Sequence, residues 1–202
     1  MKKKIILASA SPRRRELLAQ IGVEFEIKIS QKEETYQGSD AQEVVKNLAC
    51  MKAEAVEEEI LAEEGTQAEL RDMVILGSDT VVVLDGEILG KPKDIEDARR
   101  MLEQIRGRAH KVCTGTALIS YDSEGRRTLR KNAVTTKVNV HDMTEDEISA
   151  YIATGEPMDK AGAYGIQGRF AAYIDGIEGD YYNVVGLPVS SVYQTLKELE
   201  AF

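Results

Sequence analysis

Three arginines stand where a helix is predicted to begin, and their position favours the binding of an anion. They occupy positions 13–15, directly after Ser11 and Pro12, which suit the N-cap and the first position of a helix. A helix N-terminus already carries partial positive charge, so three guanidinium groups there cost stability unless an anion is present. Free backbone N–H groups, the Ser9 and Ser11 hydroxyls and the guanidinium groups together would bind a phosphate. The alternative interpretation is a solvated basic turn beside the lysines at positions 2–4.

A single carboxylate lies between two apolar segments, where it either caps the backbone or belongs to a functional site. Residues 73–76 and 81–84 are short apolar runs, and the sequence predicts that residues 77–80 interrupt the strand they would form. If Asp79 is buried in this break, its carboxylate needs hydrogen-bond or charged partners. Gly77 beside it would allow another part of the backbone to come close.

A lysine and a glycine-rich loop are two further candidates for ligand binding. Lys52 lies on the apolar stripe of a helix predicted from its cap Asp40 to about residue 64. This lysine either extends to water or points into a cleft that holds an anion. Residues 159–168 contain three glycines beside Lys160 and Gln167. Glycine lets a backbone come close to a ligand, although a flexible loop would have the same composition.

The overall charge favours a compact anionic ligand over nucleic acid or a membrane. The 202 residues include 35 acidic and 26 basic side chains, for a net charge of −9. An acidic chain binds a nucleic-acid backbone poorly, so a basic cluster within it indicates a small anion rather than a polymer. No apolar run has transmembrane length, and the run after the N-terminal lysines is too short for a signal peptide. We therefore expect a cytoplasmic protein that binds no membrane.

The sequence offers no sign of a disulfide or a histidine-based metal site. Cys50 and Cys113 have no CxxC spacing and no clustered histidines, so reduced, buried thiols are expected. Neither histidine has neighbours typical of a metal site or a catalytic triad, and neither a phosphate-binding P-loop nor a dinucleotide fingerprint occurs. The length suits a single domain spanning residues 1–202.

Hydrophobic periodicity predicts an α/β fold with a mixed central sheet flanked by helices. Hairpins alternate with helices along the chain, which argues against a doubly wound parallel sheet. Asp85 and Gly86 form a two-residue hairpin turn, Asp94 caps a helix that Gly107 ends, and Thr144 begins a capping box with Glu147. Strands are predicted over residues 5–8, 23–29, 73–76, 81–84, 87–89, 110–121, 126–140 and 170–177, and a last helix follows residue 188.

Six motifs in one order give the chain a resemblance to a known family. They are Ser9-Ala10-Ser11-Pro12-Arg13-Arg14, Gly77-Ser78-Asp79-Thr80-Val81-Val82, Gly90-Lys91-Pro92, Gly107-x-x-His110, Asp159-Lys160-Ala161-Gly162-x-Tyr164-x-Ile166-Gln167-Gly168 and Asn183-Val184-Val185-Gly186-Leu187-Pro188. Together they resemble the Maf family of nucleoside triphosphate pyrophosphatases, once described as septum-formation inhibitors. The resemblance covers nearly the whole chain.

This resemblance implies a fold, a reaction and a cofactor. The fold is similar to that of the inosine-triphosphate pyrophosphatases, with two lobes around a cleft. The reaction is hydrolysis between the α- and β-phosphates of a nucleoside triphosphate, with a divalent cation, Mg²⁺ or Mn²⁺, as cofactor. A homodimer is also implied.

The resemblance also implies roles for individual residues. Asp79 matches the general base, and Glu34, within Glu33-Glu34-Thr35, matches a metal-site carboxylate that would share the cation with Asp79. The substrate-binding residues implied are Ser9, Arg13, Arg14, Lys52, Thr80, Lys91, Lys160 and Gln167. Arginine, threonine and glutamine at three of these positions resemble the dTTP/UTP type, whereas the 7-methyl-GTP type carries tryptophan where this chain has Arg13. Ser78 replaces the usual alanine before the base.

Two functions from different classes follow from these residues. The first is a pyrophosphatase that converts dTTP and UTP to the monophosphate and pyrophosphate, linked to the cleansing of non-standard nucleotides and to the arrest of cell division. The second is a non-catalytic nucleotide-binding regulator of cell division or septum formation. The presence of Asp79, Glu34 and both lysines, Lys52 and Lys91, favours the enzyme, because a sensor needs no base.

Overall fold

A mixed β-sheet forms the centre of the molecule, as predicted. The computed structural model describes residues 3–32, 38–64 and 69–202, and in these residues the sheet has seven strands. Strand order is β2-β1-β3-β5-β6-β7, with β4 also paired to β3; β1 runs parallel to β2 and β3, and the remaining pairs are antiparallel. The strands are β1 (Lys4–Ala8), β2 (Glu26–Ile27), β3 (Met73–Leu84), β4 (Glu87–Leu89), β5 (Ala109–Tyr121), β6 (Arg127–Val140) and β7 (Ile174–Glu178).

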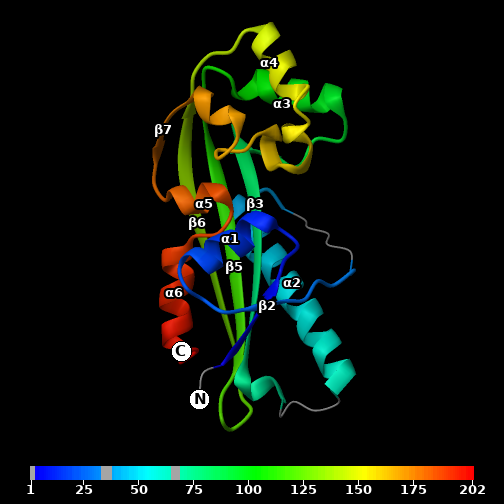
Figure 1. The fold of residues 1–202 in the computed structure, drawn as a ribbon, viewed down its shortest axis with the longest axis vertical. Coiled ribbons are helices and arrows are strands. Elements are labelled where there is room, and N and C mark those ends of the chain that lie inside the picture. The colour runs from blue at the N-terminus through cyan, green and yellow to red at the C-terminus, as the bar shows by residue number, and fades with distance from the viewer. Residues whose placement is uncertain (1–2, 33–37, 65–68) are drawn as a thin grey trace.

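The helices divide the molecule into two lobes joined by the long strands β3, β5 and β6 (Figure 1). In the first, the α1–α2 lobe, α2 packs on one sheet face, and α1, α5 and α6 lie on the other. In the second, the α3–α4 lobe, α3 and α4 lie beside short 3₁₀ turns at the far end of the sheet. None of the helices among the described residues is both long and apolar enough to cross a membrane. Helix bounds are α1 (Pro12–Gln20), α2 (Ala41–Glu64), α3 (Ile95–Ile105), α4 (Glu145–Ile152), α5 (Tyr181–Val185) and α6 (Val189–Glu198).

Several local signals for turns and helix starts are confirmed, although the Ser11 side chain at the start of α1 makes no capping hydrogen bond. The Asp94 carboxylate accepts a hydrogen bond from the Asp97 backbone N–H at 2.8 Å. Thr144 and Glu147 exchange both bonds of a capping box at the start of α4. The hairpin between β3 and β4 has positive φ at both central residues, 52° at Asp85 and 87° at Gly86. These features depend on neighbouring residues only, which explains why sequence patterns found them.

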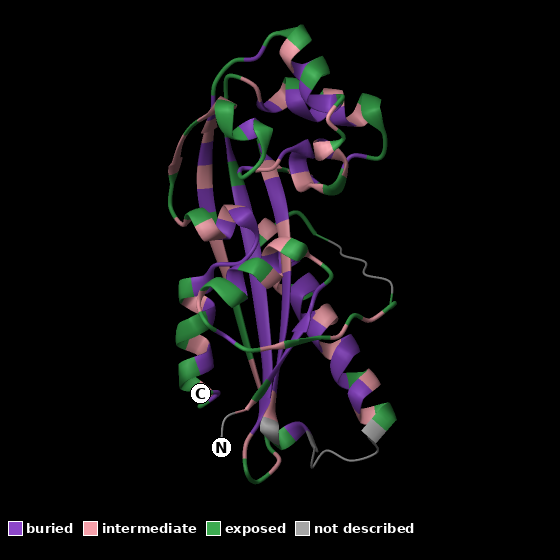
Figure 2. Ribbon diagram, in the orientation of Figure 1, coloured by how far each residue is buried: buried purple, intermediate pink, exposed green. Residues whose placement is uncertain are grey.

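Side chains alternate along β3 and divide it between the two faces of the sheet. Of the even-numbered residues, Val74, Leu76, Val82 and Leu84 belong to the core that also contains residues of α1, α3 and α6. Odd-numbered residues face α2, where Ile75 packs with helix residues such as Ala49. The central strands are buried along most of their length, as the purple ribbon in Figure 2 shows.

Two glycines let α2 lie directly against the sheet. A Cβ on Gly77 would come within 2.0 Å of the Ala49 carbonyl oxygen, and one on Gly115 within 2.2 Å of the Val45 carbonyl oxygen. Gly115 pairs with Asp79 across the two strands, and Gly77 lies two residues before Asp79 on β3. The expected close approach at Gly77 is thus an approach of the helix backbone.

Three strand predictions are wrong in extent. Residues 77–80 do not interrupt the strand, because Ser78, Asp79 and Thr80 pair in register with β5 and β3 is continuous. The predicted strand 23–29 pairs only over Glu26–Ile27, at the outer edge of the sheet. The predicted strand 170–177 begins as a 3₁₀ turn, Arg169–Tyr173, because Phe170 is drawn into the core of the α3–α4 lobe before β7 starts. Glu33-Glu34-Thr35 and the residues directly after 64, where the helix that begins at Asp40 is predicted to end, lie outside the described residues.

Candidate active site

A break in the pairing of one sheet edge positions the candidate site. Strand β1 pairs with β3 only as far as Ala8 opposite Gly77, and β4 begins its pairing at Val82. Residues 78–81 of β3 therefore have no strand on this side among the described residues. A cavity of about 620 Å³ opens here, and residues of both lobes line it. Because the edge is open, side chains from both faces of β3 reach the same cavity.

The described residues that the family resemblance singled out all line this one cavity. Asp79 and Thr80 come from β3, and the others come from the end of β1, from α1 and α2, and from two loops of the α3–α4 lobe. They are Ser9, Arg13, Arg14, Lys52, Asp79, Thr80, Lys91, Lys160 and Gln167. Glu34, predicted as a metal ligand, lies outside the described residues. The tertiary structure thus brings together segments that are up to 158 residues apart, the separation between Ser9 and Gln167.

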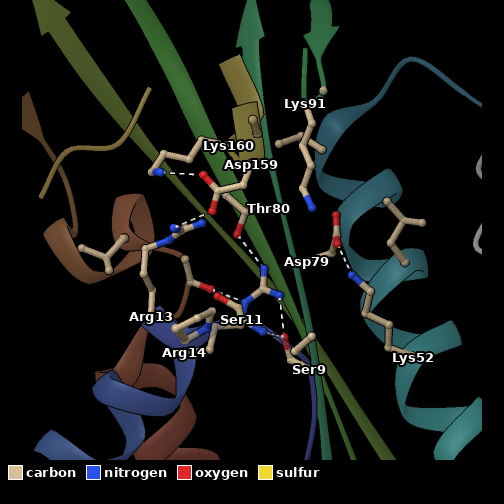
Figure 3. A pocket seen from close by; sticks show the side chains of 18 of the residues that line it. Ser9, Ser11, Arg13, Arg14, Lys52, Asp79, Thr80, Lys91, Asp159 and Lys160 are labelled. Atoms are coloured by element: carbon tan, nitrogen blue, oxygen red, sulfur yellow. Dashed lines mark hydrogen bonds and ion pairs between the residues drawn. The ribbon is translucent and has the colours of Figure 1, made fainter. Parts of the chain in front are cut away.

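On the α2 face, the Asp79 carboxylate forms an ion pair with the Lys52 ammonium group (Figure 3). Each side chain is 18% exposed, so both remain open to the cavity. Of the two interpretations of Lys52, the structure supports the one in which it points into a cleft. Lys91 also extends toward Asp79 in Figure 3, from the chain that follows β4. The carboxylate is therefore surrounded by two cationic side chains beside open space.

On the opposite face, Arg14 turns inward and binds protein oxygens. The guanidinium group donates to the Gly186 carbonyl at 2.9 Å, to Ser9 Oγ at 3.0 Å and to Thr80 Oγ1 at 3.1 Å. Arg14 is only 8% exposed, although it still borders the cavity. It thereby joins the end of β1, the middle of β3 and the turn after α5. These hydrogen bonds hold the three segments together at the edge of the cavity.

Arg13, the neighbouring arginine, reaches across the cavity toward the other lobe. Its Nη1 lies 3.5 Å from Asp159 Oδ2, and the Lys160 ammonium group lies 2.6 Å from Asp159 Oδ1. Partial burial alone would raise the pKa of Asp159, but the hydrogen bond and charge of Lys160, together with Arg13, outweigh it and lower that pKa. Asp159 is thus an ionised carboxylate that occupies two cations of the cavity. A phosphate could replace it at Arg13.

A buried aromatic pair supports the glycine-rich loop. The His110 Nε2 and Tyr164 hydroxyl lie 2.7 Å apart, and both residues are almost fully buried. The Tyr151 hydroxyl accepts the Gly165 N–H, while the Glu156 carboxylate accepts the Tyr151 hydroxyl and the Arg169 N–H. These bonds hold the loop in which Lys160 and Gln167 face the cavity. Its three glycines allow close packing against Val82, Lys160 and Glu156.

Asp159, which lines the cavity, and Thr114, which is buried and contacts a lining residue, were not among the candidates from the sequence. Asp159 is the first residue of the motif that contains Lys160 and Gln167, and its position directly before Lys160 could have indicated a place in the site. Thr114 lies in the middle of β5, where nothing in the local sequence distinguishes it from other buried strand residues. Its hydroxyl donates to the Asn183 carbonyl at 2.8 Å and lies 2.9 Å from Thr80 Oγ1. Only the register between β3 and β5 reveals this contact.

The donor chemistry at Asp79 suits a hard divalent cation, which prefers oxygen ligands. Its carboxylate faces the cavity and has a lysine as its neighbour, a partner that a cation or a phosphate group could replace. Within residues 3–32, 38–64 and 69–202, no group of three or more histidine, cysteine or acidic side chains forms a metal cluster. A complete ligand set would therefore need the substrate phosphates or residues outside these ranges. Cys50 and Cys113 are free and buried, as expected.

Comparison with known proteins identifies relatives over nearly the whole chain. A dTTP/UTP pyrophosphatase of Agathobacter rectalis is 50% identical over 198 residues, covering 96% of this chain and 97% of its own. A dTTP/UTP pyrophosphatase of Dictyoglomus thermophilum is 47% identical over 201 residues, with coverage of 98% and 97%. Among solved structures, a dITP/XTP pyrophosphatase from Mycobacterium abscessus matches with 16% identity, a TM-score of 0.37 and coverage of 75% and 95%. The model of the family described as Maf-like protein matches residues 4–199, and the chain therefore belongs to this family.

Proposed function

We propose that this protein is a nucleoside triphosphate pyrophosphatase that hydrolyses dTTP and UTP to the nucleoside monophosphate and pyrophosphate. The observation that carries the proposal is the position of Asp79, a carboxylate at an open sheet edge with Lys52 and Lys91 beside it in one cavity. Relatives named dTTP/UTP pyrophosphatase, 43–50% identical over nearly the full chain, support the choice of substrate.

The cationic side chains that line the cavity would bind the triphosphate. Lys52 and Lys91 stand on either side of Asp79, while Arg13 of α1 and Lys160 of the α3–α4 lobe lie on the Thr80 side of β3. Charge-assisted hydrogen bonds to phosphate contribute roughly 1.5–3 kcal/mol each, about twice as much as neutral ones. When the triphosphate enters, its oxygens replace Asp79 at Lys52 and Asp159 at Arg13. This exchange leaves the Asp79 carboxylate free to act on water.

Asp79 would act as the general base. Its carboxylate takes a proton from a water molecule while the water oxygen forms a bond to the α-phosphorus. The bond between the α-phosphorus and the oxygen that bridges to the β-phosphorus breaks, and pyrophosphate leaves with both electrons of that bond. The lysines stabilise the charge that develops on the leaving group.

A divalent cation, Mg²⁺ or Mn²⁺, is part of the proposal. Asp79 would hold it together with phosphate oxygens and, according to the family resemblance, with Glu34. Such a cation would supply charge neutralisation on the phosphates. The cavity offers carboxylate oxygen at the edge where the phosphates would lie, which is the chemistry that these hard cations select.

A panel of nucleotides tests the proposal directly. The purified protein is incubated with each of dTTP, UTP, CTP, GTP, ATP and dITP in the presence of Mg²⁺ or Mn²⁺, and pyrophosphate is detected after conversion to phosphate. We expect dTTP and UTP to be cleaved fastest, and chelation of the metal to abolish cleavage. Tight binding of a nucleotide without turnover under every metal condition would instead support a nucleotide-sensing regulator of cell division.

The resemblance leads to three further proposals about the protein in the cell. It forms a homodimer, acts in the cytoplasm, and links nucleotide cleansing to the arrest of cell division. Sedimentation at micromolar concentration tests the first of these, and fractionation and growth of a deletion strain test the others.

A further inference from the structure

The hydroxyl group of Thr80 belongs to a short chain of buried hydrogen bonds that begins at Arg14 and crosses two strands. Arg14 Nη2 donates to Thr80 Oγ1 at 3.1 Å. Thr80 Oγ1 and Thr114 Oγ1 are 2.9 Å apart, as expected for residues paired in register between β3 and β5. Thr114 Oγ1 then lies 2.8 Å from the Asn183 carbonyl oxygen at the α5 end of the chain.

The direction of each hydrogen bond in this series is determined by the groups at its two ends, the Arg14 guanidinium and the Asn183 carbonyl. A guanidinium group only donates, and a carbonyl oxygen only accepts. Thr114 Oγ1 and the Asn183 carbonyl oxygen are 2.8 Å apart, a distance that requires a proton between them. Thr114 therefore donates its single hydroxyl proton to the Asn183 carbonyl. Thr114 can then only accept from Thr80. The proton of Thr80 therefore points to Thr114.

Thr80 is left with one free lone pair and no free proton. Its oxygen has two lone pairs, and Arg14 occupies one of them. Thr80 is partly exposed and lines the cavity beside Asp79, as Figure 3 shows. Toward a ligand in the cavity, the Thr80 hydroxyl therefore acts as a hydrogen-bond acceptor. A ligand group that faces it must carry a hydrogen.

We propose that Thr114 is a positioning residue that fixes Thr80 as an acceptor for the N3–H group of a uracil or thymine base. This inference rests on the proposed hydrolysis of dTTP and UTP. Alternation along β3 places Thr80 on the face opposite Asp79, whose partner is Lys52. A nucleotide that passes across the open edge at residues 78–81 would then present its base to Thr80 and its phosphates to Asp79.

The same arrangement discriminates against cytosine. Cytosine carries a bare nitrogen at N3, so its lone pair would face the lone pair of Thr80 with no proton between them. An unsatisfied polar contact of this kind typically lowers affinity about tenfold. In a cavity where Thr114 did not hold the Thr80 proton, the hydroxyl could rotate and donate to cytosine. Thr114 would thus control selectivity without touching the substrate.

The test compares kcat/KM for UTP and CTP in variants of Thr114. Thr114→Val keeps the shape of the side chain but removes the acceptor for the Thr80 proton. We expect the UTP/CTP ratio of kcat/KM to fall about fivefold to tenfold, through KM, while kcat for UTP changes less than twofold. Thr114→Ser keeps the hydroxyl and should restore the wild-type ratio. The matched control is Thr116→Val, a buried threonine two residues along the same face of β5.

Several outcomes would overturn the inference. One is an unchanged UTP/CTP ratio in folded Thr114→Val, and another is an equal change in Thr116→Val. A third measurement needs no variant: the wild-type protein should cleave CTP and N3-methyl-UTP at least about tenfold less efficiently than UTP. Equal cleavage of all three would refute the acceptor role of Thr80 even if Thr114→Val failed to fold. Failure of the wild-type protein to cleave UTP would instead refute the proposed function.

Discussion

Two of the ion pairs between helix α2 and the sheet, Lys52–Asp79 and Glu57–Arg127, differ in their access to solvent. Lys52 pairs with Asp79 at the cavity, and both side chains are 18% exposed. Five residues further along the helix, Glu57 accepts two hydrogen bonds from Arg127, each of 2.8 Å, and one from the Tyr121 hydroxyl at 2.7 Å. The Glu57 side chain is only 8% exposed and borders no part of the cavity.

The difference in exposure leaves the first pair open to exchange with a ligand and makes the second pair structural. Both oxygens of Glu57 are occupied by protein donors, and burial together with the Glu57 hydrogen bond raises the pKa of Tyr121 to about 12. The Glu57 carboxylate is therefore not available to a ligand in the cavity. The Lys52–Asp79 pair, in contrast, faces a cavity with further cations, so a triphosphate and a water molecule can exchange partners with it.

Removing the carboxylate charge at the open pair should have the largest effect. Asp79→Asn keeps the shape of the side chain but abolishes its action as a base, which typically contributes about 10²–10⁴-fold to a rate. We expect kcat for dTTP to fall by that factor while the melting temperature changes little. Near-normal turnover in this variant would show that another group activates the water.

Removing the charge at the closed pair should give the opposite result. Glu57→Gln removes the charge of the nearer carboxylate at Arg127, which keeps Glu54 as a partner at 3.2 Å and is itself 34% exposed. We expect the free energy of unfolding to fall by about 1–3 kcal/mol, with kcat/KM for dTTP unchanged below the melting temperature. Urea denaturation and steady-state kinetics measure the two effects. A loss of activity without a loss of stability would erase the distinction between the pairs.

The buried His110, which is hydrogen-bonded to Tyr164, should make stability depend on pH. Burial lowers the pKa of His110 from 6.5 to about 4. Between these values the unfolded chain binds a proton that the folded chain does not, so the free energy of unfolding decreases as pH falls. At pH 5 the decrease is about 2 kcal/mol relative to pH 8.

His110→Gln removes this titration and keeps a side chain that can bind the Tyr164 hydroxyl. Urea denaturation at pH 8 and pH 5 should therefore show a smaller pH dependence in the variant than in the wild-type protein. An identical pH dependence in both would mean that other groups cause the acid sensitivity.

The smallest effect is expected at the pair that crosses the cavity. Asp159 is exposed and competes with phosphate for Arg13, and exposed pairs contribute only about 0.2–1 kcal/mol. Asp159→Asn should therefore lower KM for dTTP about twofold to fivefold at low salt, and the effect should fade as salt is added. Glu145→Gln is a suitable control, because it removes an exposed carboxylate paired with Arg106 on the α3–α4 lobe. A higher KM in Asp159→Asn would mean that Asp159 contributes to substrate binding and does not compete with it.

The sequence alone determined the features that depend on near neighbours and on motif order. Caps at Asp94 and Thr144, the turn at Asp85 and the mixed sheet follow from local periodicity and turn chemistry. The motif order identified the residues of the cavity, because they match a family in which they are brought together. The strand break predicted at residues 77–80 was wrong, since a window of sequence cannot show that β5 pairs with polar residues.

Only the tertiary structure decided how the site works. The open edge at residues 78–81 exists because β1 ends before β4 begins, and this depends on the pairing of three separate strands. Arg14 turns inward because carbonyl and hydroxyl oxygens from distant segments meet it there. The proton of Thr80 is directed by Thr114 through the register of β3 with β5. Hydrogen-bond direction and cavity shape arise from contacts between residues far apart in the chain, which no local pattern encodes.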